Sequence, residues 1–481
     1  MLNPPILNRP YGTDNQASQV GGHTRRCMNR FGPVVFGLIF LMLAAPMTSM
    51  VSHHTIELSE YEVQSAEGWN KDIDVPTWRI GDKYTYETQF DVQQLIQQAN
   101  VSATLQTLTG DTVYEIVDIL FINVDNIQTL AYKMEISGDF TSGNNGAYIE
   151  DTPLGDVSGT LDVGYDGEDL IRVRDLAVID SEFTLDVTFD AFNSAWFRQD
   201  IATISFETSY DPPKEKYDFP LHTGDQWYME FDASTDVEGE SDYFDPSEFN
   251  TAGPENNSWQ ITAAGIPTDG VDSISYTGCD DSFKINEWNE TSISQGFNWY
   301  CPAVRYNAWM RISNSAGFTI DWLLKSYTPA DSWGVQPTSN PGARNVVVDV
   351  DLQFLATLPN SEQTVSVTYE TSPGAQPQAN KNMQVRYEST DHIASPTTDG
   401  SGMIDYTLNI SDGMDTTPSS DDYSSNGVIV WDPVTEIIGA TTVVIDLNVV
   451  AIDLIAQSDS IIVTRTRGTD TVTLNPAIGY A

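Results

Sequence analysis

From residue 78 onward, apolar and polar residues alternate in short runs that predict β-strands. Runs such as TVYEIVDILFINV, QTLAYKMEISGDF and FTLDVTFDAF place Val, Ile, Tyr, Phe and Thr at alternate positions, with Gly, Asp and Asn between runs. Period-two alternation of β-branched and aromatic residues is typical of strands with one buried face. The one segment with helical character, residues 91–99, is short. The pattern therefore predicts an all-β protein.

Two stretches share a pattern that predicts an internal repeat. They read PTWRIGDKYTYETQFDV and FPLHTGDQWYMEFDAST. Each places a Gly-Asp pair, Gly81-Asp82 or Gly224-Asp225, directly before an aromatic strand, and Gly with Asp is a favoured turn pair. The offset of 143 residues (224 − 81) is about one domain length.

The repeat and the turn residues divide the chain. We expect two related, curved antiparallel half-barrel units over residues 72–212 and 213–330, or one larger sheet whose strands both segments share. Three prolines around residues 331–344 predict a linker. The remaining residues, 345–481, contain seven or eight strand-like runs, and this spacing favours an Ig-like β-sandwich.

The N-terminal part has a different character. Residues 31–52 carry no charge and contain FGPVVFGLIFLMLAAPM, and three arginines lie just before them. This order is typical of an export signal, although the apolar run is also close to the length of a spanning helix. A cleaved signal and an uncleaved anchor helix therefore both stay open for residues 1–52, as does initiation at Met28 in place of Met1. Residues 53–71 are polar and are expected to be a spacer, so that the folded part lies outside the cell or on its surface.

The chain is strongly acidic. Its 69 Asp and Glu residues outnumber 22 Lys and Arg residues, which gives a formal net charge of −47. Such a surface repels nucleic acid and anionic membranes, so membrane contact is expected only through the N-terminal apolar segment. Dissolved ions screen self-repulsion of this size. The composition favours adaptation to a saline exterior, and an ordinary acidic secreted protein is the alternative.

Two cysteines, Cys279 and Cys301, follow the apolar segment. An even pair in an exported chain predicts a disulfide, and no His lies nearby to favour a metal site. The chain also has four Asn-x-Ser/Thr acceptors for N-linked glycans, namely Asn100, Asn256, Asn289 and Asn409.

Catalytic and metal-binding patterns are not recognisable in the sequence. The five histidines lie apart from one another except for His53 and His54, and they assemble no Ser/His/Asp set or zinc site. We therefore assign no catalytic residue, no metal ligand and no cofactor, and expect a non-enzymatic protein. Calcium is considered for two acidic stretches, residues 165–170 and 237–249, because they concentrate oxygen ligands, but solvated acidic loops are the simpler interpretation.

One segment carries a family resemblance. FKI at residues 283–285 and WYCPAV at residues 299–304, together with the Gly-Asp-aromatic strands, resemble motifs of exported β half-barrel proteins. That group is similar to the LolA-like lipoprotein-carrier fold and includes uncharacterised archaeal surface proteins. The resemblance covers about residues 72–330 and implies a concave apolar face for a lipid or another amphiphile, although this chain has little helix to plug such a sheet. TDGSG at residues 398–402 resembles a turn of Ig-like and carboxypeptidase-regulatory-like surface modules.

Aromatic residues on these strands are candidates for a ligand-binding face. They are Tyr84, Tyr86, Trp227, Tyr228, Trp299, Tyr300, Trp309 and Trp322. Such side chains can stack on a glycan or line an apolar pocket, and packing in a core is the alternative. We hypothesise a non-enzymatic surface or secreted protein that binds an amphipathic or apolar ligand, a glycan or a surface partner. A structural or adhesive cell-envelope glycoprotein and a secreted hydrolase are the rival interpretations.

Overall fold

A computed structural model describes most of the chain beyond the N-terminal part. The described residues are 75–91, 93, 103–124, 127–152, 155–241, 246–289, 291–313, 319–330, 344–350, 354–356, 362–371, 376–388, 393–409, 423–434 and 438–446. The expected signal or anchor, the spacer, Asn100, most of the linker and residues 447–481 lie outside them.

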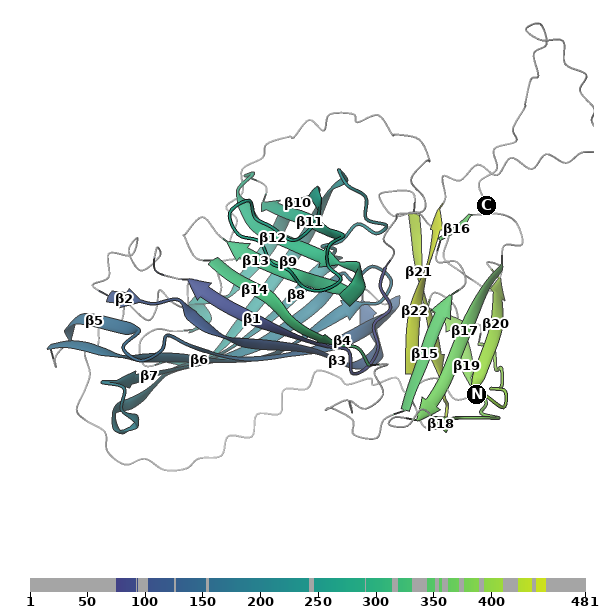
Figure 1. Ribbon diagram of the computed structural model, residues 1–481, viewed down its shortest axis with the longest axis horizontal. Helices are drawn as coiled ribbons and strands as arrows, with labels where there is room; N and C mark the ends of the chain where they lie inside the picture. Colours follow the sequence, from purple (N-terminus) through teal and green to yellow (C-terminus); the bar gives the residue numbers. More distant parts are fainter. Residues whose placement is uncertain are drawn as a thin grey trace, which may run out of the picture.

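The larger part of the described structure is one antiparallel sheet of fourteen strands (Figure 1). The strands are β1 (Lys83–Asp91), β2 (Ala103–Leu105), β3 (Leu108–Val124), β4 (Ile127–Thr141), β5 (Ala147–Thr152), β6 (Gly155–Arg172), β7 (Val178–Ala191), β8 (Arg198–Lys214), β9 (Gln226–Ser241), β10 (Thr251–Gly265), β11 (Ser282–Asn289), β12 (Ser294–Cys301), β13 (Tyr306–Ser313) and β14 (Thr319–Thr328). Strand β6 pairs with both β4 and β7, so the sheet closes on itself, and the short strands β5 and β2 extend from β6. The prediction of an all-β protein is confirmed.

The closed sheet has two consecutive halves. Around the ring the order is β1, β3, β4, β6, β7, β8 and then β9 to β14, with β8 paired to β9 and β14 paired back to β1. The expected segments 72–212 and 213–330 each supply about one half. Both contribute to one sheet, which is the arrangement we expected as the alternative; that each half is an independent unit stays a prediction.

The two Gly-Asp turns have the same local geometry. Gly81 and Gly224 have φ of 99° and 102°, in the region that favours glycine. In each turn the glycine N–H donates to an isoleucine carbonyl on the next long strand, at 2.7 Å to Ile116 and 3.0 Å to Ile261. The same isoleucine N–H then donates to the Asp carbonyl, at 3.0 and 2.9 Å. The internal repeat inferred from the sequence therefore corresponds to a repeated structure.

Alternate residues of the strands fill the interior with two apolar clusters. The first, which we call the inner cluster, lies at one end and is rich in aromatic side chains; it includes Trp78, Tyr84, Tyr132, Trp259 and Tyr300. The second cluster is aliphatic and phenylalanine-rich, and it is formed mainly by β6, β7 and β8. Burial of these faces supplies the main driving force for closing the sheet, since free energy gained scales with apolar area removed from water.

Two smaller sheets form the C-terminal part. One contains β15 (Arg344–Val350), β17 (Glu362–Thr371), β18 (Gln376–Pro377) and β20 (Met403–Asn409); the other contains β16 (Phe354–Ala356), β22 (Ile438–Asp446), β21 (Tyr423–Trp431) and β19 (Gln384–Tyr387). A shared cluster, with Val365 and Val367 from one sheet and Val428 and Val430 from the other, joins them. This is a two-sheet arrangement; its assignment as Ig-like stays a prediction.

The C-terminal sheets pack against one end of the closed sheet (Figure 1). Ile429, Trp431 and Ala440 belong to the same inner cluster as Trp78 and Tyr132. The Thr442 hydroxyl donates to the Val173 carbonyl at 3.1 Å, and the Arg386 guanidinium lies 4.3 Å from the centre of the Phe121 ring. The linker therefore joins two parts that share a core.

Helices contribute little to the described structure. The described elements other than strands are the short 3₁₀ helices η3 (Ala195–Phe197), η4 (Pro246–Phe249) and η5 (Pro302–Val304). In the part of the chain that the structure describes, no helix combines the length and apolar composition needed to cross a membrane. The segment expected to be helical, residues 91–99, begins with the last residue of β1, and residues 94–99 lie outside the described part.

Candidate functional site

Charged and hydroxyl side chains face the interior between the two apolar clusters. Tyr165 packs against both clusters and so marks the middle of the interior. Side chains two positions apart share a face of a strand, which places Asp169 on the inner face with Tyr165, and Glu287 on the inner face with Ile285 of the inner cluster. The connection from β8 to β9 packs Tyr217, Phe219 and Leu221 into that cluster. We call this polar region the chamber.

The chamber retains accessible surface although the sheet closes around it. The side chains of Lys214 and Glu287 are 13% and 16% exposed. Four tyrosine hydroxyls form no hydrogen bond among the described residues, and their oxygen atoms are not fully buried; they belong to Tyr114, Tyr165, Tyr210 and Tyr306. An inward polar group that is accessible and has no protein partner requires space for water or a ligand.

Lys214 and Glu287 form an ion pair in the chamber. The Lys214 ammonium lies 3.1 Å from Glu287 Oε1, which also accepts a hydrogen bond of 2.9 Å from Asn257 Nδ2. Burial raises the pKa of Glu287, but the ammonium groups of Lys214 and Lys216 outweigh it and hold the pKa below its ordinary value. Burial likewise opposes the charge of Lys214, and the Glu287 carboxylate outweighs it, so that the pKa of Lys214 is raised. Both groups are therefore charged at neutral pH.

A second cation and a second carboxyl group are only partly compensated by their neighbours. Lys216 forms no ion pair or hydrogen bond within the described residues, and burial, followed by repulsion from Lys214, lowers its pKa. Asp169 accepts a hydrogen bond of 2.5 Å from the Ser181 hydroxyl, yet burial raises its pKa. Burial also raises the pKa of Glu255. Incompletely compensated charge at these positions is costly and favours a polar or charged occupant.

Apolar side chains lie next to these polar groups. Trp227, Met229, Phe283 and Trp322 pack against the inner cluster and are only partly buried. The chamber therefore combines aromatic faces, hydroxyl groups and charges. Within the described residues, no group of three or more His, Cys, Asp or Glu side chains has an arrangement that could hold a metal ion.

The candidate aromatic residues lie on different faces. Tyr84, Tyr86 and Tyr300 belong to the inner cluster, and Trp227 and Trp322 pack against it. Tyr228, by contrast, is 48% exposed and donates a hydrogen bond of 2.8 Å to Asn256 Oδ1. Five of the eight residues thus face the interior.

The other two candidates, Trp299 and Trp309, form a separate small cluster with Phe297. The Trp299 indole donates to the Thr268 carbonyl at 3.1 Å, so the connection from β10 to β11 covers this cluster. The Trp309 indole donates to Asp321 Oδ1 at 2.7 Å. These two side chains are 1% exposed and have a packing role.

Other residues considered in the sequence have defined positions in the structure. The disulfide between Cys279 and Cys301 is confirmed, with an S–S distance of 2.04 Å. His222 lies in the Gly-Asp turn, where its ring nitrogen Nδ1 is 3.1 Å from Asp225 Oδ2. The acidic stretch 165–170 was expected to be a loop, and this is wrong, because it lies within β6 and directs Tyr165 and Asp169 inward. Of the second acidic stretch, residues 237–241 belong to β9 and residues 242–245 lie outside the described part.

Sequence reasoning missed the two lysines of the chamber. Only eight of the 481 residues are Lys, and two of these, Lys214 and Lys216, follow a Pro-Pro pair within five residues. A cluster of scarce cations in an acidic chain was the available signal. Their inward placement depends on sheet closure, which the local sequence does not report.

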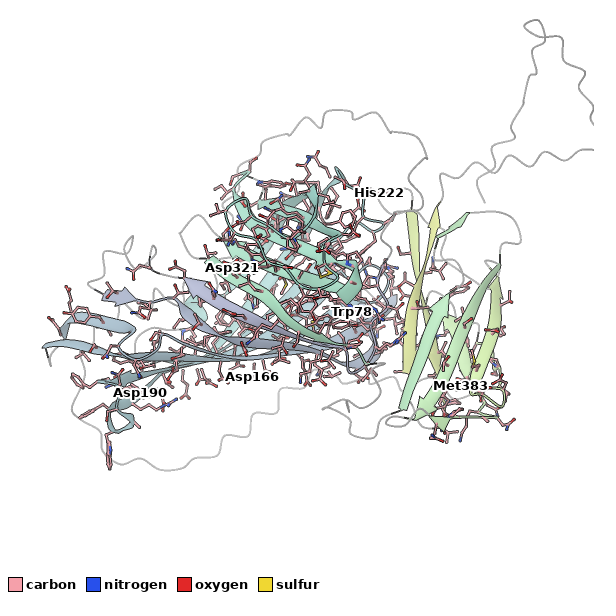
Figure 2. The ribbon with its side chains drawn as sticks, viewed as in Figure 1. Trp78, Asp166, Asp190, His222, Asp321 and Met383 are labelled. Carbon is pink, nitrogen blue, oxygen red and sulfur yellow. A yellow bond between two sulfur atoms is a disulfide. The ribbon has the colours of Figure 1, made fainter. Side chains whose placement is uncertain are left out.

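The outer face carries a row of carboxylates. In the pairing register, Glu135, Glu168, Glu182, Glu207 and Asp236 stand directly opposite one another on five neighbouring strands, β4, β6, β7, β8 and β9. The row borders an open hollow of about 330 Å³, lined partly by Asp166, which Figure 2 labels. Lys133 pairs with Glu168, and in the pairing register Lys83 stands opposite Glu115 at the end of the row.

Comparison with known proteins assigns no family. No family model and no curated protein matches the chain. Among solved structures, the N-terminal domain of the Streptococcus gordonii adhesin Sgo0707 aligns over 78% of this chain and 96% of that chain, at 9% sequence identity and a TM-score of 0.15. A score this low carries no argument about fold or function.

Proposed function

We propose that this chain is a non-enzymatic, exported cell-surface protein that binds an amphipathic molecule in the chamber of its closed sheet. The observation that carries this proposal is the set of inward, accessible polar groups without a protein partner among the described residues, Lys216 above all. Partly buried aromatic side chains beside them offer an apolar surface for the rest of such a molecule.

The other sequence expectations fit this proposal. The apolar segment at residues 31–52 supports export, and the disulfide supports an oxidising location. Asn256 and Asn289 are described at partly exposed positions and remain candidate glycan acceptors, together with Asn100 and Asn409. The C-terminal sheets are proposed to be an Ig-like spacer. Lipid, another amphiphile or a glycan with an apolar part would satisfy the chamber.

Binding measurements on the purified full chain in phosphatidylcholine nanodiscs test the proposal. We expect dodecanoic acid to bind and to change the fluorescence of the inward tryptophans. Lys216→Ala should weaken this binding at least about tenfold, because a tenfold change corresponds to about 1.4 kcal/mol, a modest charge-assisted contact.

Lys284→Ala provides the matched control. This ammonium lies 4.4 Å from the centre of the Phe297 ring, in the separate aromatic cluster outside the chamber. Equal loss of binding in the two variants would refute the proposal. It would also be refuted if dodecanoic acid gave no signal and organic solvent extracted no amphiphile from the native protein.

A further inference from the structure

Three aromatic side chains project into solvent at the tip of the hairpin formed by β7 and β8. Phe192, Trp196 and Phe197 are 48%, 94% and 54% exposed. Single exposed apolar residues are ordinary, but three large rings within six residues form a patch that a protein in water alone does not favour. The tip therefore indicates contact with another surface.

Hydrogen bonds to neighbouring segments hold the tip in a defined backbone conformation. Phe192 and Asn193 have φ of 57° and 51°, a region that a phenylalanine adopts only at a cost. The Phe192 N–H donates to the Ser158 carbonyl at 2.7 Å. Asn193 and Asn145 are joined twice, because Asn145 N–H donates to Asn193 Oδ1 at 2.9 Å and Asn193 Nδ2 donates to Asn145 Oδ1 at 2.8 Å. The neighbouring turn thus holds the aromatic tip in place.

The tip differs in charge from the rest of the chain. Residues 191–199, AFNSAWFRQ, contain no acidic residue and include Arg198, whose side chain is 50% exposed and lies 3.9 Å from the carboxylate of the neighbouring Asp190. The supporting turn, residues 141–149, contains no charged residue. In a chain of net charge −47 this is a local exception, and because Arg198 also offsets Asp190, the tip repels phosphate groups less than the acidic surfaces elsewhere do.

We propose that this tip inserts into the interfacial region of a lipid bilayer. Tryptophan favours that region, where its ring meets both apolar chains and polar head groups. The Phe192 and Phe197 rings meet edge to face, with centroids 5.8 Å apart, and such a small projecting aromatic tip enters a deformable lipid surface more readily than it fills a rigid protein groove. The proposal is independent of the chamber.

The position of the tip is compatible with attachment of the same chain to that membrane. Asp190, two residues before Phe192, lies at the end of the long hairpins that points away from the C-terminal sheets (Figure 2). Residues 53–74 separate the apolar N-terminal segment from the first described residue, and a stretch of this length can span at most roughly 70 Å. That reach is greater than the length of β7, which at about 3.3 Å per residue is roughly 45 Å.

Fluorescence of the full chain in phosphatidylcholine vesicles with brominated acyl chains tests the proposal. Bromine quenches only tryptophans close to it, so the difference between wild type and Trp196→Phe isolates Trp196. We expect quenching in the wild type that Trp196→Phe abolishes. Phe192→Asn, a change that relieves the strained φ, combined with Phe197→Ser should reduce the quenching of Trp196 several-fold.

A transferred tryptophan provides the control. Val271, in the connection from β10 to β11, is 90% exposed. The double variant Trp196→Phe/Val271→Trp places an equally exposed indole there, and we expect it to remain unquenched. Equal quenching at the two positions, or absence of quenching at Trp196, would overturn the proposal.

Discussion

Asp82 and Asp225 occupy the same position in the two Gly-Asp turns but have different surroundings. Each accepts a hydrogen bond of 2.8 Å from the backbone N–H three residues earlier, at Arg79 and His222. Asp82 is fully buried, and its second oxygen accepts the Ala330 N–H at 2.9 Å. The carboxylate therefore joins the first turn of the closed sheet to the end of its last strand, whereas the Asp225 side chain is 33% exposed.

Asp82→Ala should lower the free energy of unfolding more than Asp225→Ala does. The first change removes the carboxylate acceptor of a buried backbone N–H, at Ala330, and of a partly buried one, at Arg79, at a cost of about 1–3 kcal/mol for each lost hydrogen bond. The second leaves one donor that water can reach, and its cost should be about 1 kcal/mol. Guanidinium titration of the two variants measures the difference; equal losses would contradict the role assigned to Asp82.

At this scale the sequence predicted the turns but not their long-range partners. Gly-Asp before an aromatic strand is a local signal, and both turns are present. The contact between Asp82 and Ala330 joins residues 248 positions apart. No local pattern encodes that pairing, and the same reason explains why Lys216 and Asp169 were not recognised as neighbours.

At the scale of elements, a buried carboxyl group lies where the C-terminal sheets meet the closed sheet. Glu388 follows β19, and its side chain is 4% exposed. Its Oε1 lies 3.6 Å from Arg174, in the connection between β6 and β7, while its Oε2 has no hydrogen-bond partner among the described residues. Burial raises the pKa of Glu388 to about 7, with Asp175 adding to the effect and Arg174 and Arg172 opposing it.

Stability of this junction should fall as pH rises from about 4.5 to about 7. The folded form binds the Glu388 proton more tightly than the unfolded form, so deprotonation costs stability through that window. Glu388→Gln keeps a neutral side chain and should be more stable than wild type at pH 8, on the order of 2 kcal/mol, with little difference at pH 4.5. Denaturant midpoints at the two pH values measure this; an equal effect at both would contradict it.

Strands were easier to predict than the faces they present. Alternation identified β1, β4 and β7, whose inner residues are apolar almost throughout. Strand β6 breaks the pattern, because Gly167 and Asp169 stand on its inner face among acidic neighbours, and residues 165–170 therefore resembled a loop. Asp169 belongs to the chamber, so the residues that interrupt the apolar alternation in β6 are also those that matter for the proposed binding site.

At the scale of the whole molecule, the carboxylate row concentrates repulsion. Like charges directly opposite on neighbouring strands destabilise a sheet, and Glu207 stands between Glu182 and Asp236. Among the described residues, lysines pair with Glu168 within the row and with Glu115 at its end, and no ion pair is found for Glu182, Glu207 or Asp236, so these charges depend on dissolved ions for screening. The composition predicted a need for screening, while the register shows where the need is greatest.

Glu207→Gln should stabilise the protein by about 0.5–1 kcal/mol at 0.1 M NaCl and by much less at 1 M. The screening length falls from about 10 Å to about 3 Å between these concentrations, which removes most of the repulsion that the substitution relieves. Thermal midpoints at the two salt concentrations test this. Asp281→Asn, which removes an exposed carboxylate outside the row, is the control, and an equal salt response from both variants would show that position in the row does not matter.

Closure of the sheet also determines how the molecule bears mechanical load. Strands β1 and β14 are antiparallel neighbours, and Lys83 stands opposite Thr328, so the chain enters and leaves the ring at one point. A force that pulls these two ends apart loads the β1–β14 ladder one hydrogen-bonded pair at a time, beginning beside the Asp82 contact with Ala330. Tension applied between residues 83 and 328 is therefore borne first by this seam, while the other strand pairs of the ring carry little of it.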